Sequence, residues 1–152
     1  KQIHLVDMSD SGNTYYTLPL RLDRIVNKKF HPLCSLQESI AQNLYLLITT
    51  GFKEFRYDHT YGCIIWEQDF EILANIKWKD MLSGSLEETI KIHEERLKNT
   101  RVKIEIEEYK FLSKESIRIK KKLIVRIEGF TVKTNERFEF VEQVFIAPFS
   151  LE

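Results

Sequence analysis

The sequence predicts an α+β fold, with N-terminal helices packed on a small antiparallel meander sheet formed mainly by the C-terminal half. Two observations carry this prediction. In the first half, apolar residues recur at intervals of three and four, which is typical of one face of a helix. From Val102 onward they alternate with charged residues, which is typical of strands that bury one face. The change falls within residues 85–106, where an expected helix leads almost directly into the first strand.

The length and charge of the chain limit the classes of function. A chain of 152 residues can bury one core, and we expect a flexible lead-in over residues 1–17 and a single domain over residues 18–152. Lys plus Arg and Asp plus Glu both number 23, so no bulk charge favours nucleic acid. No apolar run approaches the roughly 18 residues needed to cross a membrane, and we expect a cytoplasmic protein.

The first elements are expected to be helical. Approximate helical spacing over residues 18–30 ends at His31-Pro32, because proline disfavours helical backbone in the residue before it. The clearest helix covers residues 35–50, where Ser35 and Glu38 form a capping box and Gly51 is placed to close the helix in a left-handed conformation. One apolar face of this helix is expected in the core: Leu36, Ile40, Leu44, Leu47 and Ile48.

The middle of the chain is less regular. Residues 52–66 mix aromatic and charged residues without a period, which indicates an ordered loop. Its end, residues 63–66, predicts a short buried strand. A further helix is expected from Asp69 and is expected to break over residues 79–84.

The central helix and the sheet complete the predicted fold. Ser85 and Glu88 repeat the capping-box pattern and predict that the helix starts there, and Asn99 is expected to stop it in a left-handed conformation. Three alternating runs follow, separated by polar turn signals at residues 113–116 and 133–136. The apolar residues expected on the buried face include Val102, Ile104, Ile106, Leu123, Val125, Ile127, Phe138, Phe140 and Val144.

Neighbouring strands of the predicted sheet carry charges of opposite sign. Basic residues gather in residues 118–126 and acidic residues in residues 105–108. We interpret them as cross-strand pairs on a solvent-facing surface; in another interpretation the same charges, especially the lysines, protect an edge against uncontrolled pairing. A nucleic-acid patch is the alternative interpretation of the basic strand.

Residues with catalytic or metal-binding chemistry are scattered. Cys34 and Cys63 lack the spacing of a metal site or a disulfide framework, so we expect reduced, partly buried thiols, no metal and no cofactor. We interpret His93 as a satisfied core histidine. Glu54 and Asp58 lie near aromatic residues and form the best candidate carboxylate pair for a glycosidase, which needs one protonated and one ionised carboxyl group. Solvated surface charges are the simpler interpretation.

The turn after the clearest helix resembles that of a known family. The apolar helix runs into a turn that holds Thr50, Gly51 and Glu54, and Tyr61-Gly62-Cys63 stands at a later glycine. This order is similar to that of the phage baseplate wedge family often labelled lysozyme-like, which includes the type VI secretion baseplate subunit TssE. The family turn is of the type Thr-x-x-Gly-Glu, so two residues are inserted here between glycine and glutamate. The resemblance covers residues 18–146.

The Glu-Pro-Arg signature of that family is similar to Glu94-Glu95-Arg96. Glu94 and Arg96 match, and Glu95 replaces the proline, so the central helix is expected to extend further here. Residues two apart on a helix point in different directions, and we therefore expect Glu94 and Arg96 to contact two different surfaces rather than each other. The alternative is that both are ordinary solvated charges.

The resemblance implies a non-enzymatic wedge subunit of a contractile injection machine. It implies docking on wedge proteins of the TssF, TssG and TssK type and a sheet edge offered for strand addition to sheath proteins of the TssB and TssC type, without nucleic acid or membrane insertion. Partner binding is assigned to Glu94, Arg96, Glu54 and Arg101, and Arg96→Ala is expected to weaken the wedge complex with thermal stability nearly unchanged. A peptidoglycan hydrolase using Glu54 and Asp58, and a generic adaptor using the same sheet edge, are the alternatives.

Overall fold

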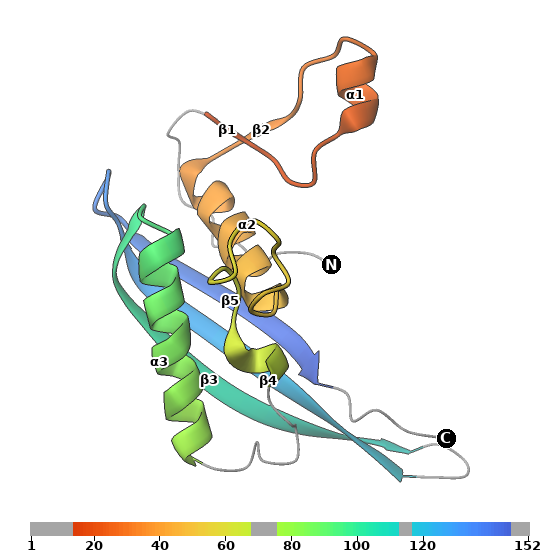
Figure 1. Cartoon of the computed structure of the whole chain (residues 1–152), viewed down its shortest axis with the longest axis vertical. Coiled ribbons are helices and arrows are strands. Elements are labelled where there is room, and N and C mark those ends of the chain that lie inside the picture. The colour runs from red at the N-terminus through yellow and green to blue at the C-terminus, as the bar shows by residue number, and fades with distance from the viewer. Residues whose placement is uncertain (1–13, 68–75, 113–116, 147–152) are drawn as a thin grey trace.

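The computed structural model describes residues 14–67, 76–112 and 117–146 and confirms the predicted α+β class (Figure 1). Two short strands and a short helix come first, followed by two longer helices and a three-stranded sheet. The elements are β1 (Tyr15–Tyr16), α1 (Leu22–Val26), β2 (Leu33–Cys34), α2 (Leu36–Thr49), the 3-10 helix η1 (Ile64–Glu67), α3 (Ile76–His93), β3 (Leu97–Leu112), β4 (Ile117–Thr131) and β5 (Arg137–Ile146).

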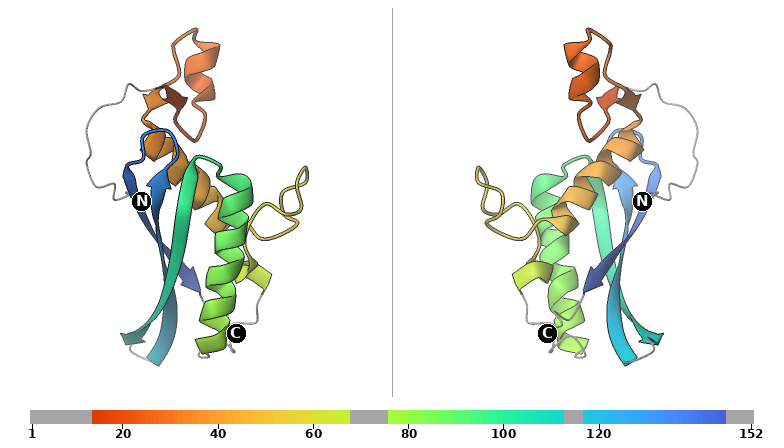
Figure 2. Two further views of the ribbon diagram at one scale, coloured as in Figure 1. Left: turned by 90° about the vertical axis from the view of Figure 1, so that its left-hand side faces the viewer. Right: turned by 90° about the vertical axis from the view of Figure 1, so that its right-hand side faces the viewer.

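The larger sheet is the antiparallel meander that the alternating runs predict. Its strand order is β3-β4-β5, so neighbours in the sheet are also neighbours in the sequence. Helices α2 and α3 lie on one face of this sheet (Figure 2). The expected alternation places one side of each strand in the core against those helices. The buried apolar residues of these strands are Leu97, Val102, Ile104, Leu123, Val125, Ile127, Phe138, Phe140 and Val144.

Helix α2 begins as the sequence predicts and ends differently. The Glu38 N–H donates to Ser35 Oγ at 3.2 Å and the Ser35 N–H donates to Glu38 Oε2 at 2.8 Å, which is the predicted capping box. Gly51 is not left-handed, and that prediction was wrong. The chain leaves the helix through extended Thr50, whose carbonyl accepts the Cys63 N–H at 2.9 Å, so this end is closed by a distant segment.

Helix α3 is one continuous element, and the predicted break over residues 79–84 and the predicted start at Ser85 were wrong. Four buried residues, each four positions after the last, form one apolar face that continues across residues 79–84. Burial of this face stabilises the helix through that region. Gly84 sits within the helix with open space where a Cβ would lie. The helix expected from Asp69 begins outside the described residues. The buried face consists of Trp78, Leu82, Leu86 and Ile90.

Two further expectations are corrected near the ends of these helices. Residues 63–66 do not form a strand; Cys63 makes a single bridge to Gly51, and the chain continues as the 3-10 helix η1. Asn99 is left-handed as expected, with φ of 53°, but it lies within β3, where the register to β4 shifts between Lys98 and Arg101.

The first described elements form a projecting arm, which we define as residues 15–34. Strands β1 and β2 pair antiparallel, and the Thr17 N–H donates to the Pro32 carbonyl at 3.1 Å. Helix α1 is shorter than the helix expected over residues 18–30, and left-handed Lys28 follows it. The expected flexible lead-in stays a prediction for residues 1–13, whereas Tyr15–Tyr16 belong to this arm. No helix among the described residues is long and apolar enough to cross a membrane.

Candidate partner-binding site

Glu94 and Arg96 contact each other, contrary to the expectation that they would face different surfaces. Arg96 donates from Nε to Glu94 Oε1 at 2.6 Å and from Nη2 to Glu94 Oε2 at 2.5 Å, a two-pronged ion pair. The physical reason is that α3 ends at His93, so the expected extension through Glu95 was wrong and the two residues lie in a turn. The Glu94 side chain is 1% exposed and that of Arg96 is 32% exposed.

Helix α2 completes the surroundings of this pair. Asn43 Nδ2 donates to Glu94 Oε2 and to the His93 carbonyl, both at 3.0 Å, and therefore caps the end of α3. Arg96 Nη1 donates to Ser39 Oγ at 2.8 Å, one helical turn before Asn43. The guanidinium also lies 5.5 Å from the centre of the Tyr15 ring, a cation–π contact with the arm. The turn thus joins three elements of the fold.

Glu94 and burial have opposite effects on the pKa of Arg96 and the same effect on the pKa of Tyr61. The hydrogen bond that Arg96 donates to Glu94 raises the pKa of Arg96, and burial opposes that rise. Burial raises the pKa of the Tyr61 hydroxyl, and the negative charge of Glu94 adds to the rise. Tyr61 Oη donates to Asn43 Oδ1 at 3.0 Å, so a neutral phenol is the form that the network uses. The buried carboxylate is therefore matched by one cation and by neutral donors.

The loop of residues 50–63 is fastened to the end of α3 through His93. The His93 ring lies 3.2 Å from the Thr60 carbonyl through Nε2 and 3.8 Å from Asp58 Oδ2 through Nδ1. It also packs edge-on against Tyr61. His93 is satisfied, as we expected, but by contacts with this loop at the periphery of the molecule.

The other two predicted binding residues have separate surroundings. Exposed Glu54 accepts the Gly51 N–H through Oε2 at 2.7 Å and so tightens the turn after α2. Arg101 is exposed on β3, opposite Glu128 of β4. The structure thus brings Glu94 and Arg96 into one network and places Glu54 and Arg101 on the surface outside it.

The structure weakens the interpretation of Glu54 and Asp58 as a hydrolytic pair. The Thr60 hydroxyl donates to Asp58 Oδ1 at 2.6 Å, and this hydrogen bond lowers the pKa of Asp58. A general acid for glycoside cleavage needs a carboxyl group with a raised pKa, so Asp58 is unsuited to that role. Among the described residues, no group of three or more His, Cys, Asp and Glu side chains could hold a metal ion.

Three residues of the network were missed in the sequence: Tyr15, Ser39 and Asn43. Helical periodicity places Asn43 opposite the apolar face of its helix, which gives no sign that it binds a buried carboxylate. Ser39 and Asn43 are four apart and therefore share one helical face, which is the signal that could have paired them. Their distance in sequence from Glu94 left no local sign of the contact.

The charged strands pair as predicted in the described part of the sheet. Lys122 Nζ lies 3.0 Å from Glu107 Oε2, and Arg126 Nη1 donates to Glu139 Oε1 at 2.7 Å. These cross-strand pairs neutralise Lys122 and Arg126, the basic residues of β4 whose side chains the structure describes, on the face away from the helices. They support the interpretation of a finished surface over that of a nucleic-acid patch.

Both cysteines are free and buried, and we expect them to resist alkylation in the folded protein. Burial raises the pKa of Cys63 to about 12 and also raises that of Cys34, so little thiolate forms at about pH 8. Iodoacetamide should label both residues only after unfolding in urea, as read by mass spectrometry. Because the unfolded thiol of Cys63 ionises near 9.0, the free energy of unfolding should fall as the pH rises from there toward 12. Rapid labelling of folded Cys63 would contradict its burial.

Comparison with known proteins identifies the family. The sequence model of the baseplate wedge protein gp25 family matches residues 34–136, which is more than half of the chain. The chain belongs to this family. The matched residues include α2 and the Glu94–Arg96 turn, and they begin at the last residue of the arm.

A solved structure shows the same fold. A protein of Geobacter sulfurreducens that is named as a tail lysozyme superposes with a TM-score of 0.56 and 21% sequence identity. The match covers 80% of this chain and 100% of the other. No curated protein sequence matches the chain. As a gp25-family baseplate component, this chain interacts with other baseplate proteins.

Proposed function

We propose that this chain is a structural wedge subunit of the TssE type in a contractile injection machine. It docks on wedge proteins of the TssF, TssG and TssK type and starts the sheath by offering a sheet edge to TssB- and TssC-type proteins. The observation that carries the proposal is the match to the baseplate wedge protein gp25 family over residues 34–136. We further propose that it acts in the cytoplasm and has no hydrolase activity.

The sheet supports the proposed strand addition. In the order β3-β4-β5, strand β4 is paired on both sides, whereas β3 and β5 are each paired on one side within the described sheet. Such outer strands present backbone N–H and C=O groups that a strand from another protein can bind. Strand β5 contributes Arg137–Ile146, long enough for a continuous ladder.

In this proposal some of the site residues contact the partner, and Glu94 holds one of them in place. Glu94 is too deeply buried to reach a partner and instead holds the Arg96 guanidinium in place. The exposed part of Arg96, with the surface residues Glu54 and Arg101, supplies polar contacts to the wedge partner. An arginine held by a carboxylate on one side can present its remaining donor edge to carbonyl or carboxylate oxygens.

Hydrogen–deuterium exchange with purified sheath protein tests the strand addition. We expect backbone amides of β5 or of β3 to gain protection on binding, because a new strand pairs with groups that were open to water. Strand β4 is the internal control, since its amides are already flanked by strands on both sides. A sheath complex that protects neither outer strand would contradict strand addition. Failure of the chain to bind any wedge or sheath protein would contradict the wedge role itself.

A further inference from the structure

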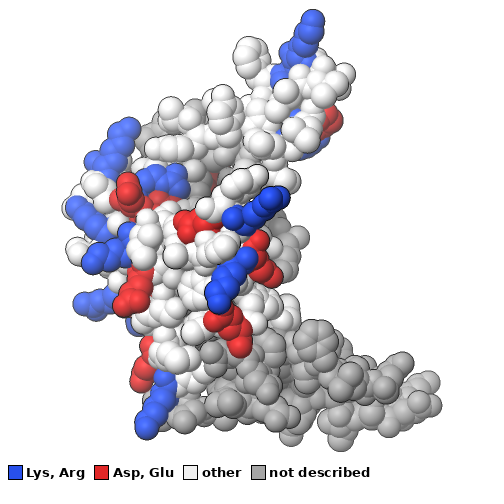
Figure 3. Space-filling view, in the orientation of Figure 1, with Lys and Arg blue, Asp and Glu red and all other residues white. Residues whose placement is uncertain are grey.

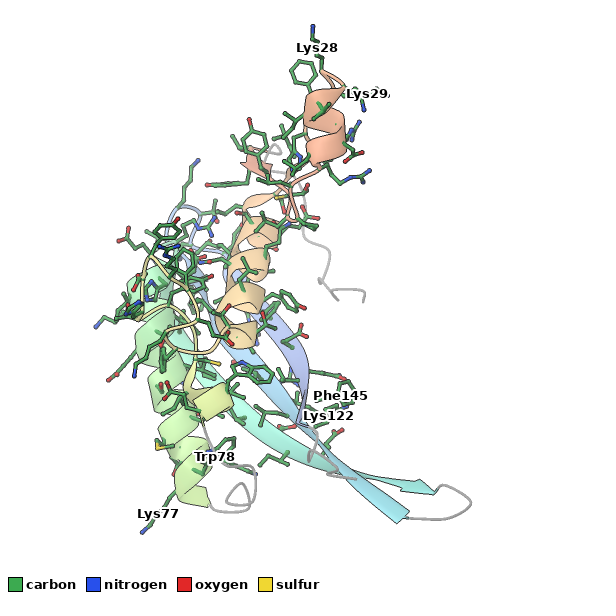
Figure 4. The ribbon with its side chains drawn as sticks, turned by 45° about the vertical axis from the view of Figure 1, so that its right-hand side comes forward. Lys28, Lys29, Lys77, Trp78, Lys122 and Phe145 are labelled. Atoms are coloured by element: carbon green, nitrogen blue, oxygen red, sulfur yellow. The ribbon has the colours of Figure 1, made fainter. Side chains whose placement is uncertain are left out.

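The arm exposes an unusual concentration of large apolar side chains. Phe30 is 95% exposed and Val26 is 81% exposed, and both lie in the outer half of the arm. Figure 4 shows Lys28 and Lys29 at its far end, pointing away from the body. Apolar exposure continues along the arm toward its base. The other exposed apolar residues of the arm are Tyr16, Leu18, Leu20, Leu22, Ile25 and Leu33.

The exposure belongs to an ordered unit. The Arg21 N–H donates to His31 Nδ1 at 3.3 Å, which leaves Nε2 to donate to the Thr17 carbonyl at 2.8 Å across the arm. The Leu18 N–H donates to Gln42 Oε1 of α2 at 3.0 Å, which ties the arm to the body. A two-stranded unit without a core of its own is only marginally stable in water, so burial of its apolar side chains by a partner would stabilise it.

The charge of the arm indicates the chemistry of that partner. Residues 15–34 contain four Lys and Arg residues and one Asp, a formal charge of +3 in a chain whose total is zero. Asp23 pairs with Arg21, so the remaining basic residues, Arg24, Lys28 and Lys29, set the sign of the outer half. Figure 3 shows this basic end standing clear of the acidic residues of the body. A complementary surface is apolar along its floor and acidic at its rim.

Two other occupants fit these observations less well. Packing the arms of two copies together would place one +3 segment against another, which like charges oppose. An anionic lipid surface would suit the tip, but the apolar residues run from Phe30 back to Tyr16 and Leu33 on the two-stranded sheet. A groove that follows the length of the arm can enclose all of them, whereas a flat surface can cover only one side of the arm.

We propose that the arm docks into an acid-rimmed apolar groove of another baseplate subunit. The identity of the partner as a baseplate subunit rests on the proposed function. The region matched by the gp25 family begins at Cys34, where the arm ends, so the arm lies outside the matched region. It would select the neighbour in this particular machine, whereas the shared fold supplies the general wedge architecture.

Paired variants test this docking against purified baseplate subunits of the same machine. Val26→Ser with Phe30→Ser removes apolar surface, and Lys28→Glu with Lys29→Glu reverses the charge at the tip. Each double variant is expected to weaken the complex at least about tenfold by calorimetry, the size typical of losing central contacts. Added salt should weaken the wild-type complex and have less effect on the charge-reversed one. Control variants, Ile92→Ser and Lys91→Glu, alter exposed apolar and basic residues of α3, outside the arm, and should bind as the wild type does.

The outcomes separate this proposal from the proposed function. If both arm variants bind baseplate subunits as tightly as the wild type, the arm does not dock on those subunits, and the proposed wedge role is not contradicted. If the wild type binds no baseplate subunit but hydrogen exchange shows sheath binding, both the docking partner and the wedge contact are wrong. Binding of the wild type to phosphatidylglycerol vesicles, or a dimer in light scattering, that disappears in Val26→Ser with Phe30→Ser would replace the protein groove by a membrane or a second copy.

Discussion

Replacing Glu94 by alanine is expected to lower the free energy of unfolding by about 3 kcal/mol, because it leaves one partner of a buried ion pair without the other. The Glu94 carboxylate accepts hydrogen bonds from both Arg96 and Asn43, and its side chain is 1% exposed. Its removal leaves the Arg96 guanidinium without its counter-charge, and the Asn43 amide, which also caps α3 through the His93 carbonyl, loses one of its two acceptors. Urea unfolding followed by circular dichroism measures the change.

The neighbouring residue provides the control. Glu95 is exposed in the same turn, and Glu95→Ala should change the free energy of unfolding by less than about 0.5 kcal/mol. Equal losses in the two variants would mean that the buried pair adds nothing beyond an ordinary surface charge. Arg96→Ala should also lower the free energy of unfolding, because it leaves the buried Glu94 carboxylate without its cation. The expectation from the sequence that its stability would be nearly unchanged therefore conflicts with the contacts of Arg96.

Replacing Gly62 by alanine is expected to destabilise the protein by about 3 kcal/mol, through backbone clash and an unfavourable φ angle. Gly62 has φ of 126°, and a Cβ there would lie 2.7 Å from the Thr50 carbonyl oxygen and 2.8 Å from that of Gly51. Both atoms are backbone, so neither can move aside by a change of rotamer. The substitution would push Cys63 away from Thr50, whose carbonyl now accepts the Cys63 N–H.

At Gly84 the same substitution is expected to stabilise the protein. Gly84 lies inside α3, where an added Cβ would meet nothing within 4 Å, and it shows no positive φ. Gly84→Ala should therefore raise the free energy of unfolding by about 0.7 kcal/mol, the usual gain from alanine in a helix. Thermal unfolding of both variants tests the pair. Similar melting temperatures for Gly62→Ala and the wild type would mean that the turn after α2 relaxes without cost.

Local patterns in the sequence predicted the elements whose formation depends on neighbours in the chain. The capping box of Ser35 and Glu38 is satisfied within four residues, and the alternation from Val102 onward is a pattern visible within a few residues; both predictions are confirmed. The same kind of pattern misled at Ser85 and Glu88. That spacing lies within a longer helix whose start is determined by burial of Trp78 and of the residues that follow it at intervals of four.

The candidate site could be predicted only in part, because its contacts are long-range. The family resemblance selected Glu94 and Arg96, but it could not reveal that Asn43, 51 residues earlier, binds the same carboxylate. Nor could charge alone reveal burial: glutamate at the end of an amphipathic helix ordinarily faces water. Because the helix was expected to continue through Glu95, the side chains of Glu94 and Arg96 were expected to point in different directions, and this was wrong.

The strand order β3-β4-β5 has a consequence for the order of events in folding. Each strand pairs with the next one along the chain, so the sheet forms from segments that need only short loops to close. The hydrogen bond between Asn43 and Glu94 instead joins segments 51 residues apart and requires a much longer closure. Collapse of α3 onto the meander can therefore precede the arrival of α2. The contacts of the Glu94 network then form late in folding, so mutations in the network should change mainly the rate of unfolding.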